Sequence, residues 1–223
     1  MPVDIDPDNP PSARRMLEAM THDARALARP PTTTTIRPED WDGGDLSGRR
    51  FDAVDFAGVD LAEQHERGAA FVDCTFRGVR FNAGEHRDAA FMNATFIDCS
   101  FFDVRFLACK LVGSVFDRCA FGPLVVEGGD WSLVSLAGAD LRQSTFRGVR
   151  LAEADLSGAR FDEAVLRDCA LGGAWLRGTI LHGTDLRGSD LSALDPLDAD
   201  VHEARIDVEQ ALVIATALGL RLE

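Results

Sequence analysis

The residues with the clearest potential for chemistry are a glutamate and a histidine that lie 20 positions apart. Glu66 and His86 stand where the equivalent residues before and after them are Leu or Phe, and His65 and Glu85 complete a small cluster. Imidazole and carboxylate groups bind metals and also act as general acids and bases. A metal or acid–base site is therefore one interpretation. The other is structural, either a local bulge that turns both side chains outward or a buried Glu–His pair, and we favour it.

The cysteines give no further catalytic candidate. All five lie two places before a position that is otherwise Leu or Phe, namely Cys74, Cys99, Cys109, Cys119 and Cys169. Cys99 and Cys119 have the same spacing as Glu66 and His86 and could approach each other, but small inward cysteines are usually packing residues. The sequence contains no Walker A loop, no G-x-G-x-x-G at a strand–helix turn and no H-E-x-x-H helix. We predict a protein that is not an enzyme and has no catalytic, metal or cofactor-binding residues.

Composition narrows the class of protein further. The 223 residues include 37 acids and 23 bases, which gives a formal net charge of −14. Proteins that bind nucleic acid directly usually carry a basic face, so we expect no direct nucleic-acid binding. No apolar run reaches the 18 or so residues of a membrane span, and the first residues lack the features of a signal peptide. Together with five cysteines and no CxxC pair, this favours a cytoplasmic protein without membrane contact.

These residues are positioned by a repeat with a period of five. Of the 30 positions found by counting in fives from Leu46 to Leu191, 26 are Leu or Phe. This column holds 13 of the 14 phenylalanines, and Glu66 and His86 are its only polar members. The residue two places earlier is mostly small, and the two places that follow favour polar residues and glycine.

A period of five fits neither an α-helix nor an ordinary β-strand. It fits a chain that turns a corner at every fifth residue, so that four successive corners close one coil. Coils of this kind stack at the ~4.8 Å spacing of paired strands. Phenylalanines recur at the interval of one such coil, as in Phe56, Phe76 and Phe96, which predicts aromatic ladders inside an all-β solenoid of about eight coils.

The segments 139–143 (ADLRQ) and 154–158 (ADLSG) carry the A(D/N)LXX pattern of pentapeptide repeat proteins, which the chain resembles over most of its length. The resemblance implies a right-handed quadrilateral β-helix. It is greatest to the MfpA and Qnr branch, which protects DNA gyrase from fluoroquinolones. The unbroken register and the stretches 111–116 and 208–212 favour the MfpA type, because Qnr proteins usually contain inserted loops.

The two ends of the chain depart from the repeat. We expect residues 1–35 to form an N-terminal extension that is partly helical or disordered, residues 36–206 the β-helix, and residues 207–223 a C-terminal helix. Asp207 and Gln210 form a capping-box pattern, and Gly219 is placed to end the helix. This helix is apolar on nearly all sides, so one side can cover the last coil while another meets a second copy. The predicted homodimer interface comprises Val208, Ala211, Leu212, Ala215 and Leu218.

The densest acidic segment precedes this helix. Residues 181–210 carry a net charge of −6, and the predicted partner-binding patch comprises Asp185, Asp190, Asp195, Asp198, Asp200 and Glu203. The resemblance implies a rigid acidic dimer that occupies the DNA channel of gyrase. The leading hypothesis is thus a non-catalytic DNA mimic that binds DNA gyrase or a related type II topoisomerase and protects it from fluoroquinolones. The alternative is a cytosolic protein-interaction scaffold of the same repeat class, in which the acidity serves only solubility.

Overall fold

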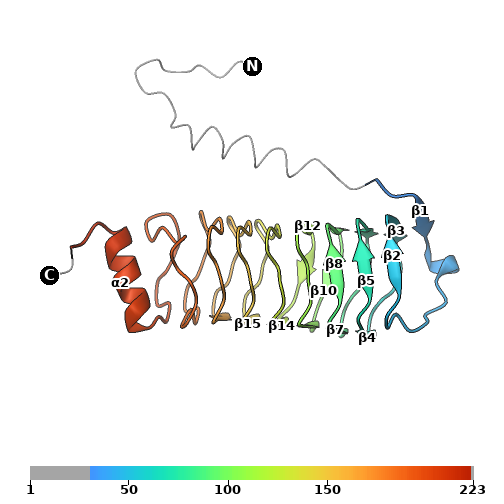
Figure 1. Ribbon diagram of the computed structural model, residues 1–223, viewed down its shortest axis with the longest axis horizontal. Coiled ribbons are helices and arrows are strands. Elements are labelled where there is room, and N and C mark those ends of the chain that lie inside the picture. Colours follow the sequence, from blue (N-terminus) through green and yellow to red (C-terminus); the bar gives the residue numbers. More distant parts are fainter. Residues whose placement is uncertain (1–30, 222–223) are drawn as a thin grey trace, which may run out of the picture.

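The computed structural model describes residues 31–221, which form a β-solenoid closed at its C-terminal end by one helix (Figure 1). Each coil of the solenoid has four flat faces, and each face is one parallel sheet. The expected N-terminal helical segment lies in residues 1–30, outside the described residues. None of the described helices is long and apolar enough to cross a membrane.

We number the faces I to IV in the order in which the chain visits them. Face I contains β2 (Arg50–Asp52), β5 (Ala70–Val72) and β8 (Ala90–Met92). Face II contains β1 (Thr34–Ile36), β3 (Val54–Ala57), β6 (Thr75–Arg77), β9 (Thr95–Ile97) and β12 (Val115–Asp117). Face III contains β10 (Ser100–Phe101) and β13 (Ala120–Phe121). Face IV contains β4 (His65–Arg67), β7 (Glu85–Arg87), β11 (Arg105–Leu107), β14 (Val125–Glu127), β15 (Thr145–Arg147) and β16 (Val165–Arg167).

Every pair of strands is parallel and joins residue i to residue i+20. On face IV the ladder begins at His65 and continues through strands and single bridges to Arg205, with this spacing at every step. These seven steps at ~4.8 Å give a ladder of about 34 Å. The expected fold, an all-β solenoid with four corners to a coil, is confirmed.

The core is the column of Leu and Phe side chains, stacked coil upon coil. Phe56, Phe76 and Phe96 are at most 1% exposed, and their rings lie parallel at centroid distances of 4.9 and 5.0 Å. Neighbouring ladders meet edge to face, as at Phe71 and Phe76, with centroids 5.4 Å apart. Both arrangements are favourable for aromatic pairs, so the phenylalanines hold adjacent coils as well as adjacent faces together.

A left-handed backbone residue makes most of the corners between faces. It stands two places after the inward residue of the column, as at Gly58 (φ +69°), Glu63 (φ +58°) and Leu133 (φ +61°). Glycine adopts this conformation freely, whereas other residues pay about 1–2 kcal/mol. Sixteen of these corners are not glycine, so ladder pairing and core packing must hold the corner in place where local preference does not.

Both ends of the solenoid have their own covering elements. The first ladder starts with β1, which pairs with β3 from Thr34 onward. A short 3-10 helix, η1 (Pro38–Asp40), follows, and Trp41 then packs edge to face against Phe56 at 6.5 Å. At the other end α2 (Val208–Ala217) lies across the last coil (Figure 1). Its predicted capping box is present, since Asp207 accepts from the Gln210 backbone N–H and the Gln210 side chain accepts from the Asp207 N–H.

Two adjacent phenylalanines allow a test of the inward column. Phe101 is 1% exposed and stacks on Phe81 at 4.8 Å, whereas Phe102 is 46% exposed. We expect Phe101→Ala to lower the free energy of unfolding by about 3–5 kcal/mol, because it leaves a cavity in the stack. Phe102→Ala, the control, should cost about 1 kcal/mol or less. Denaturant unfolding followed by circular dichroism measures both, and equal losses would contradict this account of the core.

Candidate protein-binding surface

The predicted acidic patch is divided among four faces. Asp185 lies on face IV, Asp190 on face I, and Asp195 and Asp198 on face II, so the residues encircle the last coil. Of the six predicted residues, Asp200 and Glu203 share face III. The six predicted residues therefore do not share one face. Charges spaced five residues apart in a square coil must point in different directions.

Several of these aspartates also stabilise a backbone turn with their side chains. Asp190, Asp195 and Asp200 each accept a hydrogen bond from the backbone N–H two residues later, at 2.9–3.1 Å. The same turn recurs at Asp45 and Asp60 near the other end of the rod. Aspartate favours such turns because its side chain bonds to its own backbone. Part of the acidity of the chain thus comes from the turn that each coil requires.

Asp185, one of the predicted binding residues, pairs with an arginine of its own face. It is 8% exposed, and its two carboxylate oxygens accept hydrogen bonds from the Arg187 guanidinium at 2.8 and 2.7 Å. That hydrogen-bonding arginine holds the pKa of Asp185 below its usual range. The carboxylate is neutralised within its own face, so little of its charge is offered to a partner.

The excess negative charge lies instead along face III. We define this face by the segments 59–63, 79–83, 99–103, 119–123, 139–143, 159–163, 179–183 and 199–203. It carries eight acids (Asp60, Glu63, Asp103, Asp140, Asp162, Glu163, Asp200 and Glu203) and three arginines (Arg80, Arg142 and Arg160), a net −5. Face IV, counted over 64–188, has six acids and six arginines and is neutral. By the same counting, face I (49–193) carries −1 and face II (54–198) carries −3.

Within face III the arginines neutralise only some of the acids. Ion pairs join Asp60 to Arg80, Asp140 to Arg142 and Asp162 to Arg160. Glu63, Asp103 and Glu163 are exposed at corners of this face, and the described residues place no arginine against them. Sorting the sequence into four columns by the length of one coil would have revealed this face, whereas counting charges along the chain did not.

Face III also has an exposed aromatic residue and a hollow. The ring of Phe102 lies over Gly122, where an added Cβ would come within 2.5 Å of the ring. Beside Gly122 and Pro123 is a hollow of about 510 Å³, whose lining includes Arg142 and Glu163. An acidic face with an exposed phenylalanine is the kind of surface that suits protein recognition.

The outer side of α2 is a second exposed surface, and it is apolar. Val208 is 74% exposed, Leu212 48% and Leu218 46%. Ala211 is also exposed and Ala215 half-buried, so the predicted interface residues lie mostly at the surface. Leu197, Ile206, Val213 and Leu220 are further exposed apolar residues near this end of the chain. Several large apolar side chains exposed together mark a site of protein association.

The inner side of α2 is held by polar contacts. The amide of Gln210, the one fully buried residue of the helix, donates to the carbonyls of Leu186 and Ser189, both at 2.7 Å. Asp207 accepts from the backbone N–H of Gly188 at 2.9 Å. These bonds tie the helix to backbone groups of the last coil, although the Leu186 carbonyl also accepts from the Ser189 N–H at 3.0 Å.

The Glu66–His86 cluster is a buried pair inside the solenoid. The two side chains are at most 1% exposed, with His86 Nδ1 2.8 Å from Glu66 Oε1. The second oxygen of Glu66 accepts from the Ala69 N–H at 3.2 Å, and the imidazole stacks on Phe106 at 5.1 Å. The outward bulge is therefore wrong and the buried pair is confirmed. His65 is exposed and Glu85 is paired with Arg87, so the predicted four-residue cluster does not converge.

The cysteines occupy inward packing positions, as expected. Cys74 and Cys109 are fully buried, and burial raises the pKa of their thiols to about 11 and about 12. A thiol with so high a pKa holds little thiolate at neutral pH and is a poor nucleophile. Cys99 and Cys119 are both free thiols, and each donates to a backbone carbonyl.

Comparison with known proteins finds pentapeptide repeats in this chain. A family model described as pentapeptide repeat region matches residues 99–176, and one described as pentapeptide repeats (8 copies) matches residues 164–195. The pentapeptide repeat protein MfpA of Mycobacterium tuberculosis (strain ATCC 25618 / H37Rv) is 36% identical over 104 residues, or 47% of this chain and 54% of MfpA. The chain thus spans about half the length of this curated relative.

Solved structures with the same fold include QnrB1, described as a plasmid-mediated fluoroquinolone resistance protein. One trypsin-treated form is 18% identical with a TM-score of 0.61, covering 85% of this chain and 96% of QnrB1. A second trypsin-treated form, also at 18% identity and 0.61, covers 86% and 97%. At 18% sequence identity, the structural similarity to QnrB1 establishes the fold alone.

The Glu66–His86 pair predicts an asymmetry between single and double substitutions. Glu66→Leu alone should lower the free energy of unfolding by about 3–5 kcal/mol, because His86 is left buried without its partner. Adding His86→Phe should recover much of that loss, since it continues the aromatic ladder and removes the stranded polar group. Denaturant unfolding of both single variants and the double variant gives the coupling energy. Simple additivity would mean that the two side chains do not act as a pair.

Proposed function

The chain is a pentapeptide repeat protein of the MfpA and Qnr type, and from this premise we propose that it binds DNA gyrase, or a related type II topoisomerase, in place of DNA. In this proposal the protein is non-catalytic, acts in the cytoplasm and does not bind nucleic acid itself. By occupying the DNA-binding channel it competes with DNA and protects the enzyme from fluoroquinolones.

The observation that carries the proposal is the uneven charge of the four faces. Face III has a net charge of −5 and runs along the rod, while face IV is neutral. Surfaces that bind DNA are basic, so a rigid acidic face is electrostatically complementary to them. Such complementarity raises the rate of association and fixes the orientation of a complex.

The net charge of face III limits how much it can contribute to the binding affinity. Duplex DNA carries about 20 phosphate charges over a length of about 34 Å, at one charge per ~1.7 Å. Face III has far fewer, so charge alone does not reproduce the affinity of DNA. We infer that the rigid shape and the exposed ring of Phe102 supply the remaining contacts, while the acids orient the rod in the channel.

We further propose a twofold homodimer formed through α2. The exposed side chains of Val208, Leu212 and Leu218 are apolar, and a second copy of the same surface would cover them. With about 34 Å from each solenoid and about 10 Å for each helix, the dimer would be roughly 90 Å long. The acids that encircle the last coil, including Asp190 and Asp195, would then lie on both sides of the central seam.

The alternative function is a protein-interaction scaffold for a different partner. The apolar side of α2 and the hollow near Gly122 both suit protein binding without any topoisomerase. In that case the carboxylates of Asp190, Asp195 and Asp200 would serve their turns and solubility alone. The charge-variant experiment below separates the two functions.

One prediction of the gyrase proposal concerns the acids of face III. Glu63→Gln, Asp103→Asn and Glu163→Gln together remove three unpaired charges at left-handed corners. If each contact contributes up to ~1 kcal/mol, binding to gyrase should weaken by about 1–3 kcal/mol, and its salt dependence should decrease. Binding at several salt concentrations and quinolone-stabilised DNA cleavage by gyrase measure the effect.

Matched control substitutions are available on other faces. Glu153→Gln, Asp168→Asn and Asp73→Asn also remove three acids at left-handed corners, on faces I and IV. This control should bind gyrase nearly as the wild type does. Equal weakening by both triple variants would argue against a special role for face III. A wild-type protein that changes neither supercoiling nor cleavage would overturn the gyrase proposal and leave the scaffold.

Another prediction concerns the proposed dimer. Leu212→Arg places a charge in the apolar surface of α2, and burying it without a partner is costly. We expect a monomer with an unchanged circular dichroism spectrum, because coils of a repeat protein contact mainly their neighbours. Glu209→Arg, on an exposed polar position of the same helix, is the control that should remain dimeric. Light scattering measures the oligomeric state. If Leu212→Arg remains dimeric, the dimer interface does not lie at this surface of α2.

A further inference from the structure

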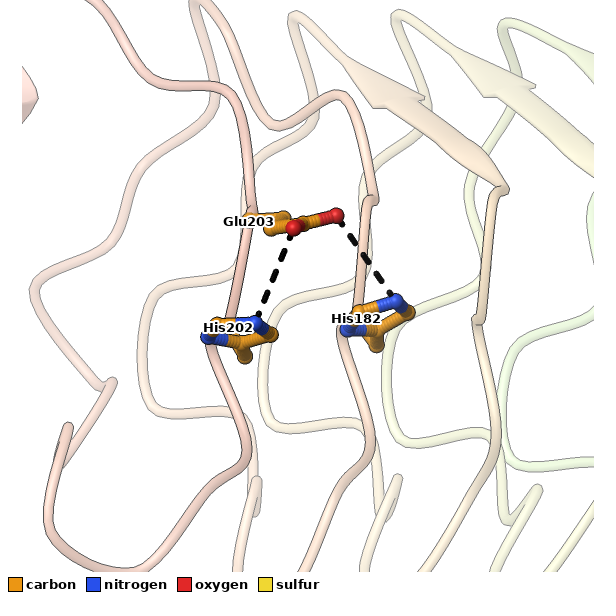
Figure 2. Close-up of side chains that lie close together, drawn as sticks. All are labelled: His182, His202 and Glu203. Atoms are coloured by element: carbon orange, nitrogen blue, oxygen red, sulfur yellow. Dashed lines mark ion pairs between the residues drawn. The ribbon is translucent and has the colours of Figure 1, made fainter.

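Two histidines and a glutamate converge on the surface of the last two coils. His182 and His202 occupy equivalent positions of successive coils on face III, and Glu203 follows His202 at the corner (Figure 2). Their side chains are 41%, 71% and 68% exposed, respectively. The donor atoms of the three residues all lie within 4.8 Å of one another.

The backbone fixes this convergence. The N–H of Leu181 donates to the carbonyl of Asp200 at 2.7 Å, and the N–H of Gly183 donates to the carbonyl of His202 at 3.0 Å. The two imidazoles are therefore held one above the other, with centroids 5.3 Å apart and planes 17° from parallel. Glu203 has a left-handed backbone (φ +56°), and its carboxylate reaches back toward both rings (Figure 2).

The distances suit a shared cation better than direct hydrogen bonds. Nε2 of His182 is 3.9 Å from one Glu203 oxygen, and Nε2 of His202 is 3.7 Å from the other. Both distances exceed the range of a hydrogen bond. Ligands bonded to one metal ion at 2.0–2.2 Å in a tetrahedral arrangement lie roughly 3.4 Å apart, so small rotations of these exposed side chains would complete such a geometry.

We propose that His182, His202 and Glu203 form a binding site for a divalent first-row transition metal ion, with Zn²⁺ as the ion that fits best. Two neutral imidazoles and one carboxylate are a ligand set typical of zinc, and copper and nickel also favour imidazole. The exposure of the site leaves the fourth position to water. Mg²⁺ and Ca²⁺ are excluded as preferred ions because they select oxygen ligands.

The site would join the last two coils close to α2, which begins at Val208. An ion that binds the folded state more tightly than the unfolded chain stabilises the fold. Metal binding would therefore stiffen the end of the rod where the proposed dimer seam lies. The metal site itself does not depend on the gyrase or dimer proposals.

The test is a titration of the tag-free, metal-stripped full-length protein with ZnCl₂ by calorimetry, together with thermal unfolding. We expect one Zn²⁺ per chain at micromolar concentrations and a rise of Tm with zinc. His202→Gln and His182→Gln should each weaken zinc binding at least about tenfold, as loss of groups at metal sites does. Circular dichroism checks that these exposed substitutions leave the fold intact.

His65→Gln is the matched control, since His65 is also an exposed histidine beside a coil corner but lies on face IV. Its zinc affinity should equal that of the wild type. Co²⁺ as a probe adds a spectroscopic readout: the visible absorption of tetrahedral Co²⁺ should disappear in His202→Gln, without bands from thiolate ligands in the wild type. No zinc binding by the wild type, or equal affinity in His202→Gln and His65→Gln, would overturn the proposal.

Discussion

The corner at every fifth residue, left-handed at most positions, is the constraint on which the rest of the structure depends. With four corners to a coil, residue i lies beside residue i+20, and this pairing holds from the first strand to Arg205. The inward column, the aromatic ladders and the outward charges all follow from this register. At Leu133 and Glu63 the corner is occupied by a residue that disfavours it, which shows that long-range packing overrides local preference.

The same register decides which surface residues can act together. Neighbours in the sequence, such as Asp195 and Asp200, point from different faces, whereas His182 and His202 are stacked. A functional surface on this fold must therefore be assembled from residues that occupy equivalent positions of successive coils. Glu66 and His86 follow the same rule inside the rod: they occupy consecutive levels of one ladder, so a polar pair replaces two hydrophobic side chains without disturbing the coil.

The period of five was enough to predict the solenoid and its inward columns, and the spacing of Asp207 and Gln210 was enough to predict the capping box of α2, because each depends on local spacing. The six residues of the predicted acidic patch are spread over four faces, because charge density along the chain is not charge density on a surface that turns every five residues. Asp185 lies in the densest acidic segment yet is buried against Arg187, and sequence order alone does not specify that pairing. Burial of the Glu66–His86 pair also required the structure, since a bulge would give the same spacing.

The end of the rod imposes two opposite demands on α2. At the last coil, a polar side chain of the helix can donate to the backbone carbonyls of Leu186 and Ser189. Gln210 does so from within the helix, which is why a glutamine is buried while Val208 and Leu212 are exposed. Of the other helix residues, Glu209 and Thr216 are polar and exposed, and the rest are apolar. The helix thus covers the last coil through Gln210 and leaves Val208 and Leu212 exposed on its outer side, which is the surface that the proposed dimer would use.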